Sequence, residues 1–278
     1  MRPPLDGTIL ITGASSGIGR AMAVELAPRA KALVLVARRV DRLEELRDEL
    51  VARRPELVVS LQQCDLCERV ATDRMLEAVA REVGDVDVLI NNAGIGDMGA
   101  FDRADWSKTE RLIRLNVESL TYLCHRLVGP MVERRRGGIL NVSSGFGLEF
   151  MPSFATYIAS KHYVSGLTES MRLDLRSQGV VVTQVCPGPV ATEFEEHLGN
   201  FTGHKPPAFL EISAERCARS AIGGFARDRA LVIPGIAIRL VMWIGALTPR
   251  WVKRLIYRPL AGAARRVQLR AENPPAGR

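Results

Sequence analysis

A tyrosine and a lysine stand four residues apart near the middle of the chain, as Tyr157 and Lys161. In a helix, this spacing places two side chains on one face, one turn apart. Tyrosine in water has a pKa of about 10, which is too high for ready proton exchange at neutral pH. A neighbouring ammonium group stabilises the tyrosinate and lowers that pKa. The pair therefore predicts proton transfer at a carbonyl or alcohol oxygen, the partner step of hydride transfer, although the spacing by itself also fits an incidental surface pair.

A glycine-rich turn near the N-terminus could hold the phosphates of a dinucleotide. The segment 12–19 reads Thr-Gly-Ala-Ser-Ser-Gly-Ile-Gly and follows the short apolar run 8–11. Glycines allow a tight turn and a close approach of the backbone to a pyrophosphate, and the helix that begins at Ile18 would offer free N–H groups. A glycine pattern alone is weak, but its position between a strand and a helix strengthens the prediction.

These residues need a scaffold, and the hydrophobic pattern predicts one. Strands are expected at residues 8–11, 32–36, 57–62, 86–90, 138–142, 180–185 and 230–233. Helices are expected from residue 18, and over 41–53, 68–83, 108–134 and 154–177. Continuous apolar strands that alternate with helices indicate an α/β fold, a doubly wound, Rossmann-type, seven-stranded parallel sheet with helices on both faces. We expect one catalytic domain over residues 1–234 and a C-terminal helical extension over 235–278.

The glycine spacing is G-x-x-x-G-x-G, and with the Tyr157–Lys161 pair it resembles the short-chain dehydrogenase/reductase family. The resemblance covers residues 6 to 234. It implies that Tyr157 is the acid/base and that Lys161 binds the nicotinamide ribose and lowers the tyrosine pKa. Ser144 would hold and polarise the substrate carbonyl, whereas the adjacent Ser143 would face the other way and be structural. Asn116 would hold a water that connects Lys161 to solvent.

The resemblance also implies a set of cofactor contacts at four turns. The phosphate-binding turn comprises Gly13, Ser15, Ser16, Gly17, Ile18 and Gly19. Asp65 and Leu66 would lie beside the adenine, and Asn92, Ala93 and Gly94 would form the floor near the ribose. Pro187, Gly188, Val190 and Thr192 would hold the nicotinamide carboxamide.

The second expected strand ends in Ala37-Arg38-Arg39, where an acidic residue would favour NAD. Guanidinium groups suit the 2′-phosphate of the adenosine ribose instead. The first acidic residue, Asp41, is expected to be a helix cap. The sequence therefore predicts NADP(H), with Arg38 as the first candidate contact and Arg39 as the second.

The charge of the chain is unevenly distributed. The 278 residues carry a net charge of +7, but residues 235–278 alone contain nine Lys or Arg and one acid. The rest of the chain is almost neutral, so we expect no nucleic-acid partner. The five cysteines are an odd number, without a metal-binding pattern beyond Cys64 and Cys67. We expect a reduced, cytoplasmic protein without a metal, a signal peptide or a membrane-spanning helix.

The expected substrate side is apolar. Residues 193–210 form a polar insertion that could act as a lid, with His197 and His204 expected as exposed loop residues. Several apolar side chains are expected near the pocket mouth, namely Met98, Phe146, Phe150, Met151 and Phe194. They favour an apolar substrate, although core packing would explain them equally well.

The extension has two apolar segments. Residues 236–247 are apolar except for Arg239. After Pro249, one helical face would carry Trp251, Val252, Leu255, Ile256 and Pro259, and the other Lys253, Arg254, Tyr257 and Arg258. This pattern fits a helix at a membrane surface. It fits equally a helix over the substrate cleft or a neighbouring subunit, with its basic side in water. Residues 271–278 are expected to be disordered.

Three functions remain open from the sequence. The leading hypothesis is an NADP(H)-dependent enzyme that interconverts a lipid-like or steroid-like ketone or aldehyde and its alcohol. The second is a reductase of carrier-bound 3-oxoacyl chains, because the basic segment would suit an acidic carrier. The third is a non-catalytic NADP(H)-sensing protein, against which the complete Ser144, Tyr157 and Lys161 set argues. The resemblance also implies a homodimer or homotetramer formed through the helices over 108–134 and 154–177.

Overall fold

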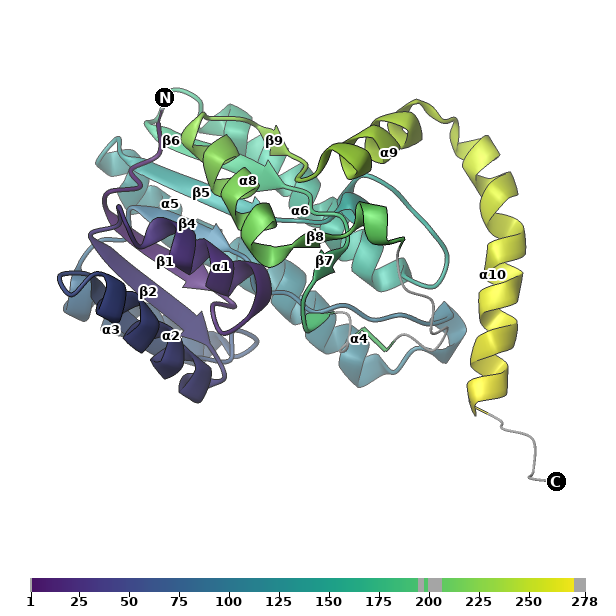
Figure 1. The fold of residues 1–278 in the computed structure, drawn as a ribbon, viewed down its shortest axis with the longest axis horizontal. Helices are drawn as coiled ribbons and strands as arrows, with labels where there is room; N and C mark the ends of the chain where they lie inside the picture. Colours follow the sequence, from purple (N-terminus) through teal and green to yellow (C-terminus); the bar gives the residue numbers. More distant parts are fainter. Residues whose placement is uncertain (1, 195–197, 200–206, 273–278) are drawn as a thin grey trace.

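Seven parallel strands form one twisted sheet in the order β3-β2-β1-β4-β5-β6-β9 (Figure 1). The structure is a computed structural model and describes residues 2–194, 198–199 and 207–272. The strands are β1 (Thr8–Thr12), β2 (Ala32–Ala37), β3 (Val58–Gln63), β4 (Val88–Asn91), β5 (Gly137–Val142), β6 (Val180–Val185) and β9 (Leu231–Val232). A separate parallel pair, β7 (Val190–Ala191) and β8 (Ile212–Ser213), was not predicted from the sequence.

Helices cover both faces of the sheet, as the alternating pattern predicted. Helices α1, α2 and α8 pack on one face, and α3, α5 and α6 pack on the other. The helices are α1 (Gly17–Leu26), α2 (Val40–Arg53), α3 (Arg69–Val83), α4 (Trp106–Ile113), α5 (Leu120–Glu133), α6 (Ala155–Asp174), α8 (Ala214–Ala226), α9 (Ile236–Leu247) and α10 (Arg250–Glu272). Short 3-10 turns are η1 (Phe101–Arg103), η3 (Gly145–Gly147) and η4 (Ala208–Leu210). The doubly wound fold is confirmed.

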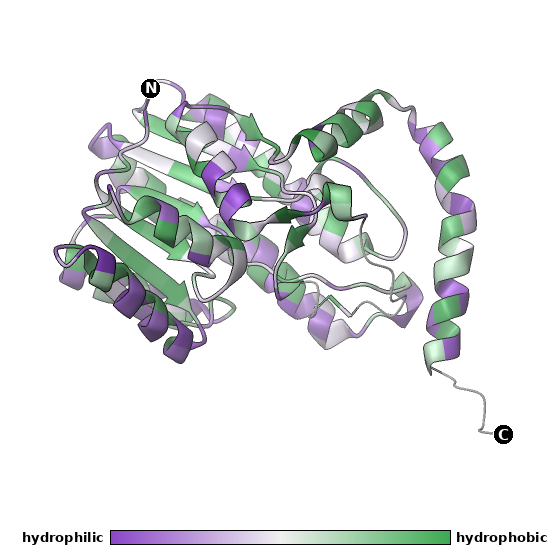
Figure 2. Cartoon of the chain, viewed as in Figure 1, coloured by the Kyte–Doolittle hydropathy of each residue, from purple (hydrophilic) through white to green (hydrophobic). Residues whose placement is uncertain are grey.

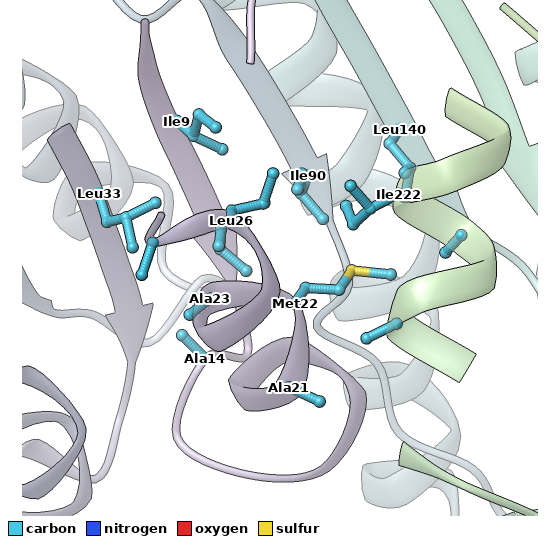
Figure 3. Close-up of a cluster of buried hydrophobic side chains, with 14 of the residues drawn as sticks. Ile9, Ala14, Ala21, Met22, Ala23, Leu26, Leu33, Ile90, Leu140 and Ile222 are labelled. Carbon is cyan, nitrogen blue, oxygen red and sulfur yellow. The ribbon is translucent and has the colours of Figure 1, made fainter. Parts of the chain in front are cut away.

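Alternation along the strands supplies a core to each face. Ile9 of β1 points toward α1 and α8, where it joins Met22 and Ile222 (Figure 3). Leu10, one residue further, belongs to the cluster on the opposite face. Ile9, Met22 and Ile222 are almost completely buried. Their burial removes apolar surface from water and stabilises the packing of the helices on the sheet. This packing holds the strands in place, and the carboxyl ends of the strands in turn position the residues of the candidate site.

Two local predictions need correction. The helix expected over 108–134 is interrupted by a π-helical turn, η2 (Arg114–Ser119), between α4 and α5. Asn116 lies within this wider turn, a kind of interruption that occurs frequently at functional sites. Asp41 does not cap α2, because the N-cap position is Arg39 and Asp41 already lies in the first helical turn. Its carboxylate is still placed where it complements the helix dipole.

The C-terminal extension forms the two helices α9 and α10, which stand at one end of the molecule (Figure 1). Helix α10 turns polar side chains toward the body. Lys253 pairs with Glu149, and Arg265 forms a two-bond ion pair with Asp102 at 2.7 and 2.8 Å. The helix also continues through residue 272, so the expected disorder from residue 271 begins too early; residues 273–278 lie outside the described residues.

Candidate active site

The predicted functional residues gather at the carboxyl edge of the sheet. Strands β1 and β4 are neighbours although they are not consecutive in the chain, so the strand order reverses between them. In doubly wound sheets, ligands bind in the crevice outside this reversal. The glycine-rich turn follows β1, and the Asn92 segment follows β4. Ser144 follows β5, which pairs with β4.

The glycine positions of the glycine-rich turn do not accommodate a side chain. Gly13 and Gly17 have φ angles of +65° and +54°, which favour glycine over other residues. A Cβ on Gly19 would lie 2.4 Å from the Asn92 amide nitrogen and 2.4 Å from the Gly13 carbonyl oxygen. The N-terminus of α1 follows directly, so its free N–H groups lie at this turn. This geometry is the one that the predicted binding of a pyrophosphate requires, and the binding itself stays a prediction.

Asn92 and Thr12 join the two halves of the crevice. The Asn92 amide donates to the carbonyl oxygens of Thr12 and Gly13, at 3.0 and 3.2 Å. The Thr12 hydroxyl oxygen accepts hydrogen bonds from the backbone N–H groups of Asn92 and Ala93, both at 3.0 Å. Thr12 was not singled out from the sequence, since a threonine at a strand end carries no distinctive signal. These bonds hold the Asn92–Gly94 segment against the glycine-rich turn.

Tyr157 and Lys161 lie on the buried side of α6 and face the end of β5. Tyr157 interacts with the Ser144 hydroxyl, and Lys161 Nζ is 5.8 Å from the centre of the Tyr157 ring. The same Nζ donates to the Val142 carbonyl oxygen at 3.1 Å. Ser143 turns away and donates to the Lys161 carbonyl oxygen at 2.9 Å, which is the structural position that strand alternation predicted. The structure thus brings the three predicted chemical groups together.

Burial sets the protonation of this pair. It raises the pKa of Tyr157 to about 12, and the hydrogen bond with Ser144 opposes the rise only in part. It lowers the pKa of Lys161 to about 8. Desolvation is the largest influence on both groups, and the lowering of the tyrosine pKa by Lys161 stays a prediction. At neutral pH, Tyr157 is a protonated donor beside a largely protonated lysine.

Asn116 is buried in the π-helical turn and is held from two directions. Its amide nitrogen donates to the Ile95 carbonyl oxygen at 2.8 Å and to the Ser160 hydroxyl at 3.1 Å. Its amide oxygen accepts from the Ile95 N–H at 3.0 Å. A Cβ on Gly94 would lie 3.3 Å from the Asn116 amide oxygen and 3.4 Å from Lys161 Nζ. Asn116, Gly94 and Lys161 therefore converge at one point.

An apolar cluster surrounds the tyrosine. Its buried members are Leu112, Phe154, Tyr157 and Ile158. The five residues expected at the pocket mouth all pack against it, namely Met98, Phe146, Phe150, Met151 and Phe194. Phe146 meets the Tyr157 ring edge-on at 6.2 Å, and Phe194 lies 5.8 Å away. The Tyr157 side chain thus lies in apolar surroundings that exclude most water. His197 and His204, expected in the lid, lie outside the described residues.

Of the two arginines after β2, Arg39 is the one that reaches the glycine-rich turn. Its guanidinium donates to the hydroxyls of Ser15 and Ser16, at 3.2 and 2.8 Å. It also pairs with Glu193 at 2.8 Å, and Arg42 pairs with the same carboxylate. Hydrogen bonds from Arg42 and Arg39 hold the pKa of Glu193 at about 2.

The first candidate, Arg38, is exposed and has no contact with the turn among the interactions described. Arg42 and Glu193 were not predicted as site residues. Arg42 lies in the first turn of α2, and its only link to this region is the ion pair with Glu193 among the interactions described.

The remaining predicted contacts divide into two groups. Asp65 is partly buried and bonded to Arg111 at 2.6 Å, and Leu66 is buried.

The second group lies in the loop after β6, where the Pro187 carbonyl accepts from the Gly145 N–H at 2.7 Å, and Val190 is buried in β7. A Cβ on Gly17 would lie 3.1 Å from Thr192, which places this threonine against the glycine-rich turn. Gly188 lies against Ile238 of α9, so the extension contacts the same loop.

Fold and site together define a doubly wound dinucleotide-binding protein with a tyrosine–lysine pair at the sheet edge. The family model described as short chain dehydrogenase matches residues 7–202. The chain therefore belongs to the short-chain dehydrogenase/reductase family, and it is an oxidoreductase by that membership.

Relatives and solved structures extend the comparison. A very-long-chain 3-oxoacyl-CoA reductase-like protein of Arabidopsis thaliana is 33% identical over 77% of this chain and 68% of the relative. A short-chain dehydrogenase from Sphingobium yanoikuyae in complex with NADPH is 33% identical, covers 86% of this chain and 93% of its own, and has a TM-score of 0.76. A bulky-bulky ketone specific alcohol dehydrogenase from Comamonas testosteroni is 28% identical, with 98% and 96% coverage and a TM-score of 0.72. Similar structures include complexes with NADPH and with NAD.

Proposed function

We propose that this protein interconverts an apolar ketone or aldehyde and its alcohol with NADP(H), and that Tyr157 is the acid/base. The observation that carries the proposal is the buried Tyr157 hydroxyl, which interacts with Ser144, lies one helical turn from Lys161 and sits inside an aromatic cluster. A protonated donor in a dry pocket is what carbonyl reduction needs.

The residues have separable roles. When bound, the cofactor supplies the hydride to the carbonyl carbon in reduction, or accepts it in oxidation. Tyr157 gives its proton to the carbonyl oxygen, and Ser144 donates a hydrogen bond that polarises the same oxygen. Lys161 supplies a positive charge that stabilises the tyrosinate left behind. Asn116 is proposed to link Lys161 to solvent, because its turn meets Lys161 and Gly94.

The phosphate-binding turn, Asn92 to Gly94, Asp65 with Leu66, and the Pro187 to Thr192 loop are proposed to hold the cofactor. The choice of NADP(H) rests on the arginines after β2. Arg39 already donates to two hydroxyls of the turn, and Arg38 presents an exposed guanidinium one residue away. Cationic groups recognise a 2′-phosphate through charge-assisted hydrogen bonds.

We expect Arg38→Gln and Arg39→Gln each to weaken NADPH binding by about 10- to 100-fold, the range of a charged hydrogen bond, with NADH binding unchanged. Arg47→Gln on α2, at a partly exposed arginine that pairs with Asp48, is the control. Equal losses for both cofactors, or tighter binding of NADH than NADPH by the parent protein, would overturn the assignment.

A panel of ketones tests the substrate class. We expect turnover with NADPH to rise with the size and apolarity of the ketone, because aromatic side chains line the surroundings of Tyr157. The second candidate function is reduction of 3-oxoacyl thioesters, favoured by the basic extension and by the name of the Arabidopsis relative. Preference for thioesters over free ketones of equal length would favour that function. Binding of NADPH without turnover on either series would favour a sensing role.

A homo-oligomer is also proposed, through the outer sides of α5 and α6. Thr121 and Tyr163 join these helices by a hydrogen bond at 3.0 Å, and Tyr163 remains 42% exposed. Light scattering coupled to size-exclusion chromatography tests this proposal, which predicts a mass of two or four chains. A monomer at micromolar concentration would exclude it.

A further inference from the structure

The extension exposes a continuous series of large apolar side chains, which we name the C-terminal apolar face. Figure 2 shows α9 as the most continuously hydrophobic helix at this end of the molecule. Six side chains of the face are between 54% and 77% exposed: Ile236, Leu240, Trp243, Leu247, Trp251 and Leu255. Phe209 of η4, against which α9 packs, is 73% exposed. Contiguous apolar surface of this kind marks an interaction site.

The orientation of α10 keeps this face outward. Its polar side is the one that packs on the body, through the Lys253–Glu149 ion pair, whose side chains are only 11% and 12% exposed. Further along the helix, Arg265 binds Asp102, and Gln268 accepts from the backbone N–H of Ala100 at 2.8 Å. The contacts of Lys253 contradict the expectation of a helix that packs over the substrate cleft with all of its basic side in water; the alternative of packing on a neighbouring subunit stays a prediction. The helix is fastened at three points with its apolar side away from the body.

Charge identifies the partner that fits this face. Six exposed arginines flank it on the two helices: Arg239, Arg250, Arg254, Arg258, Arg266 and Arg270. A second copy bound about a two-fold axis would oppose arginines with arginines, because such an interface uses the same patch twice. Acidic lipid headgroups instead complement the arginines, and tryptophans such as Trp243 and Trp251 are enriched at the boundary between headgroups and acyl chains.

Among the described residues, no helix has the length and hydropathy needed to cross a bilayer. An amphipathic helix with an aromatic-apolar face and a basic flank lies in the plane of the membrane surface. We propose that α9 and α10 dock the protein onto the surface of an anionic lipid bilayer through the C-terminal apolar face. Both helices are already formed and in contact with the body, so docking requires no new folding.

The docked face lies next to the substrate side. Ile238 of α9 packs on Gly188, and Met242 lies 2.7 Å from the position of a Cβ on Gly145, the residue after Ser144. Tyr257 of α10 meets the Phe150 ring at 5.9 Å. These contacts assign the substrate class to amphiphilic carbonyl compounds, which partition into the bilayer and reach Tyr157 from the bilayer surface. This assignment rests on the proposed function.

Vesicle co-sedimentation of the full-length protein tests the docking without cofactor or substrate. The probes are phosphatidylcholine vesicles with and without phosphatidylserine. We expect binding to the mixed vesicles and much weaker binding to neutral ones. Arg250→Gln with Arg254→Gln should lower binding to anionic vesicles on the order of 30-fold, as two lost surface cations predict. Trp243→Gln with Trp251→Gln should lower binding to both vesicle types by at least about tenfold.

Matched controls carry the same substitutions elsewhere. Val70→Gln, at a 62% exposed apolar position on α3, and Arg219→Gln, at an exposed position on α8, should leave vesicle binding unchanged. All variants should keep parent turnover of a small water-soluble ketone, which separates loss of docking from failure of the proposed function. Absence of binding to anionic vesicles would overturn the proposal. Self-association that the two tryptophan substitutions abolish, without vesicle binding, would overturn it in favour of a second copy.

Discussion

Lys161 carries a buried charge whose main partner is one neutral carbonyl, so its ammonium opposes folding at neutral pH. Its side chain is 5% exposed and donates to Val142 at 3.1 Å. Burial lowers its pKa from the ordinary 10.5 to about 8. One pKa unit corresponds to about 1.4 kcal/mol, so the charged lysine costs the folded state about 3 kcal/mol at pH 7. A methionine of similar length removes this cost but leaves the Val142 carbonyl unpaired, at about 1 kcal/mol.

We therefore expect Lys161→Met to raise the free energy of unfolding by about 2 kcal/mol at pH 7, measured by urea denaturation with tryptophan fluorescence. Between pH 8 and 10.5 the folded protein binds fewer protons than the unfolded chain, so the parent protein gains stability as pH rises through this window. The variant lacks this gain, and the difference should close by about pH 10. Lys161→Arg keeps the charge and should show no increase. A variant that is less stable at pH 7, or a difference that does not change with pH, would refute the reasoning.

Three further predictions concern the site. Carbonyl reduction should slow as pH rises through about 8, because Lys161 loses the proton that stabilises the tyrosinate; a pH profile of turnover that stays flat to about pH 10 would contradict this. Gly19→Ala should destabilise the protein by about 2 kcal/mol or more and weaken NADPH binding, because the added methyl group would lie 2.4 Å from the Asn92 amide and the Gly13 carbonyl oxygen. Thermal unfolding measures the loss of stability, and Gly129→Ala, where the added group meets nothing within 4 Å, is the control. Glu193→Gln should tighten NADPH binding by about tenfold in titration calorimetry, because a carboxylate no longer competes with the 2′-phosphate for Arg39 and Arg42; weaker binding would show that Glu193 supports the cofactor site.

Much of the fold could be predicted because each strand carries its own periodic signal. The apolar runs at Thr8–Thr12 and Val180–Val185 are buried along their whole length, as parallel strands covered on both faces must be. The π-helical turn at Asn116 could not be predicted, because it preserves the helical pattern on both sides and depends on the bonds between Asn116 and Ile95. The β7–β8 pair is two residues long and has no periodicity to detect.

The positions of the candidate site residues could be predicted from the sequence better than their pKa values and ion pairs. The positions of Tyr157, Lys161 and Ser144 follow from strand ends and helical spacing, which are local properties. Their pKa values follow from burial, which depends on how the aromatic cluster closes around them. The pairing of Arg39 with Glu193 joins residues far apart in the chain, so no local pattern could indicate it.

The central claim is that Tyr157 delivers a proton during NADPH-dependent carbonyl reduction. Single-turnover oxidation of bound NADPH by an apolar ketone tests it most directly, with the parent protein compared with Tyr157→Phe. We expect a loss of about 100- to 10,000-fold in the rate of oxidation, the usual contribution of a positioned acid, with NADPH affinity unchanged by fluorescence titration. A Tyr157→Phe protein that oxidises NADPH as fast as the parent would contradict it.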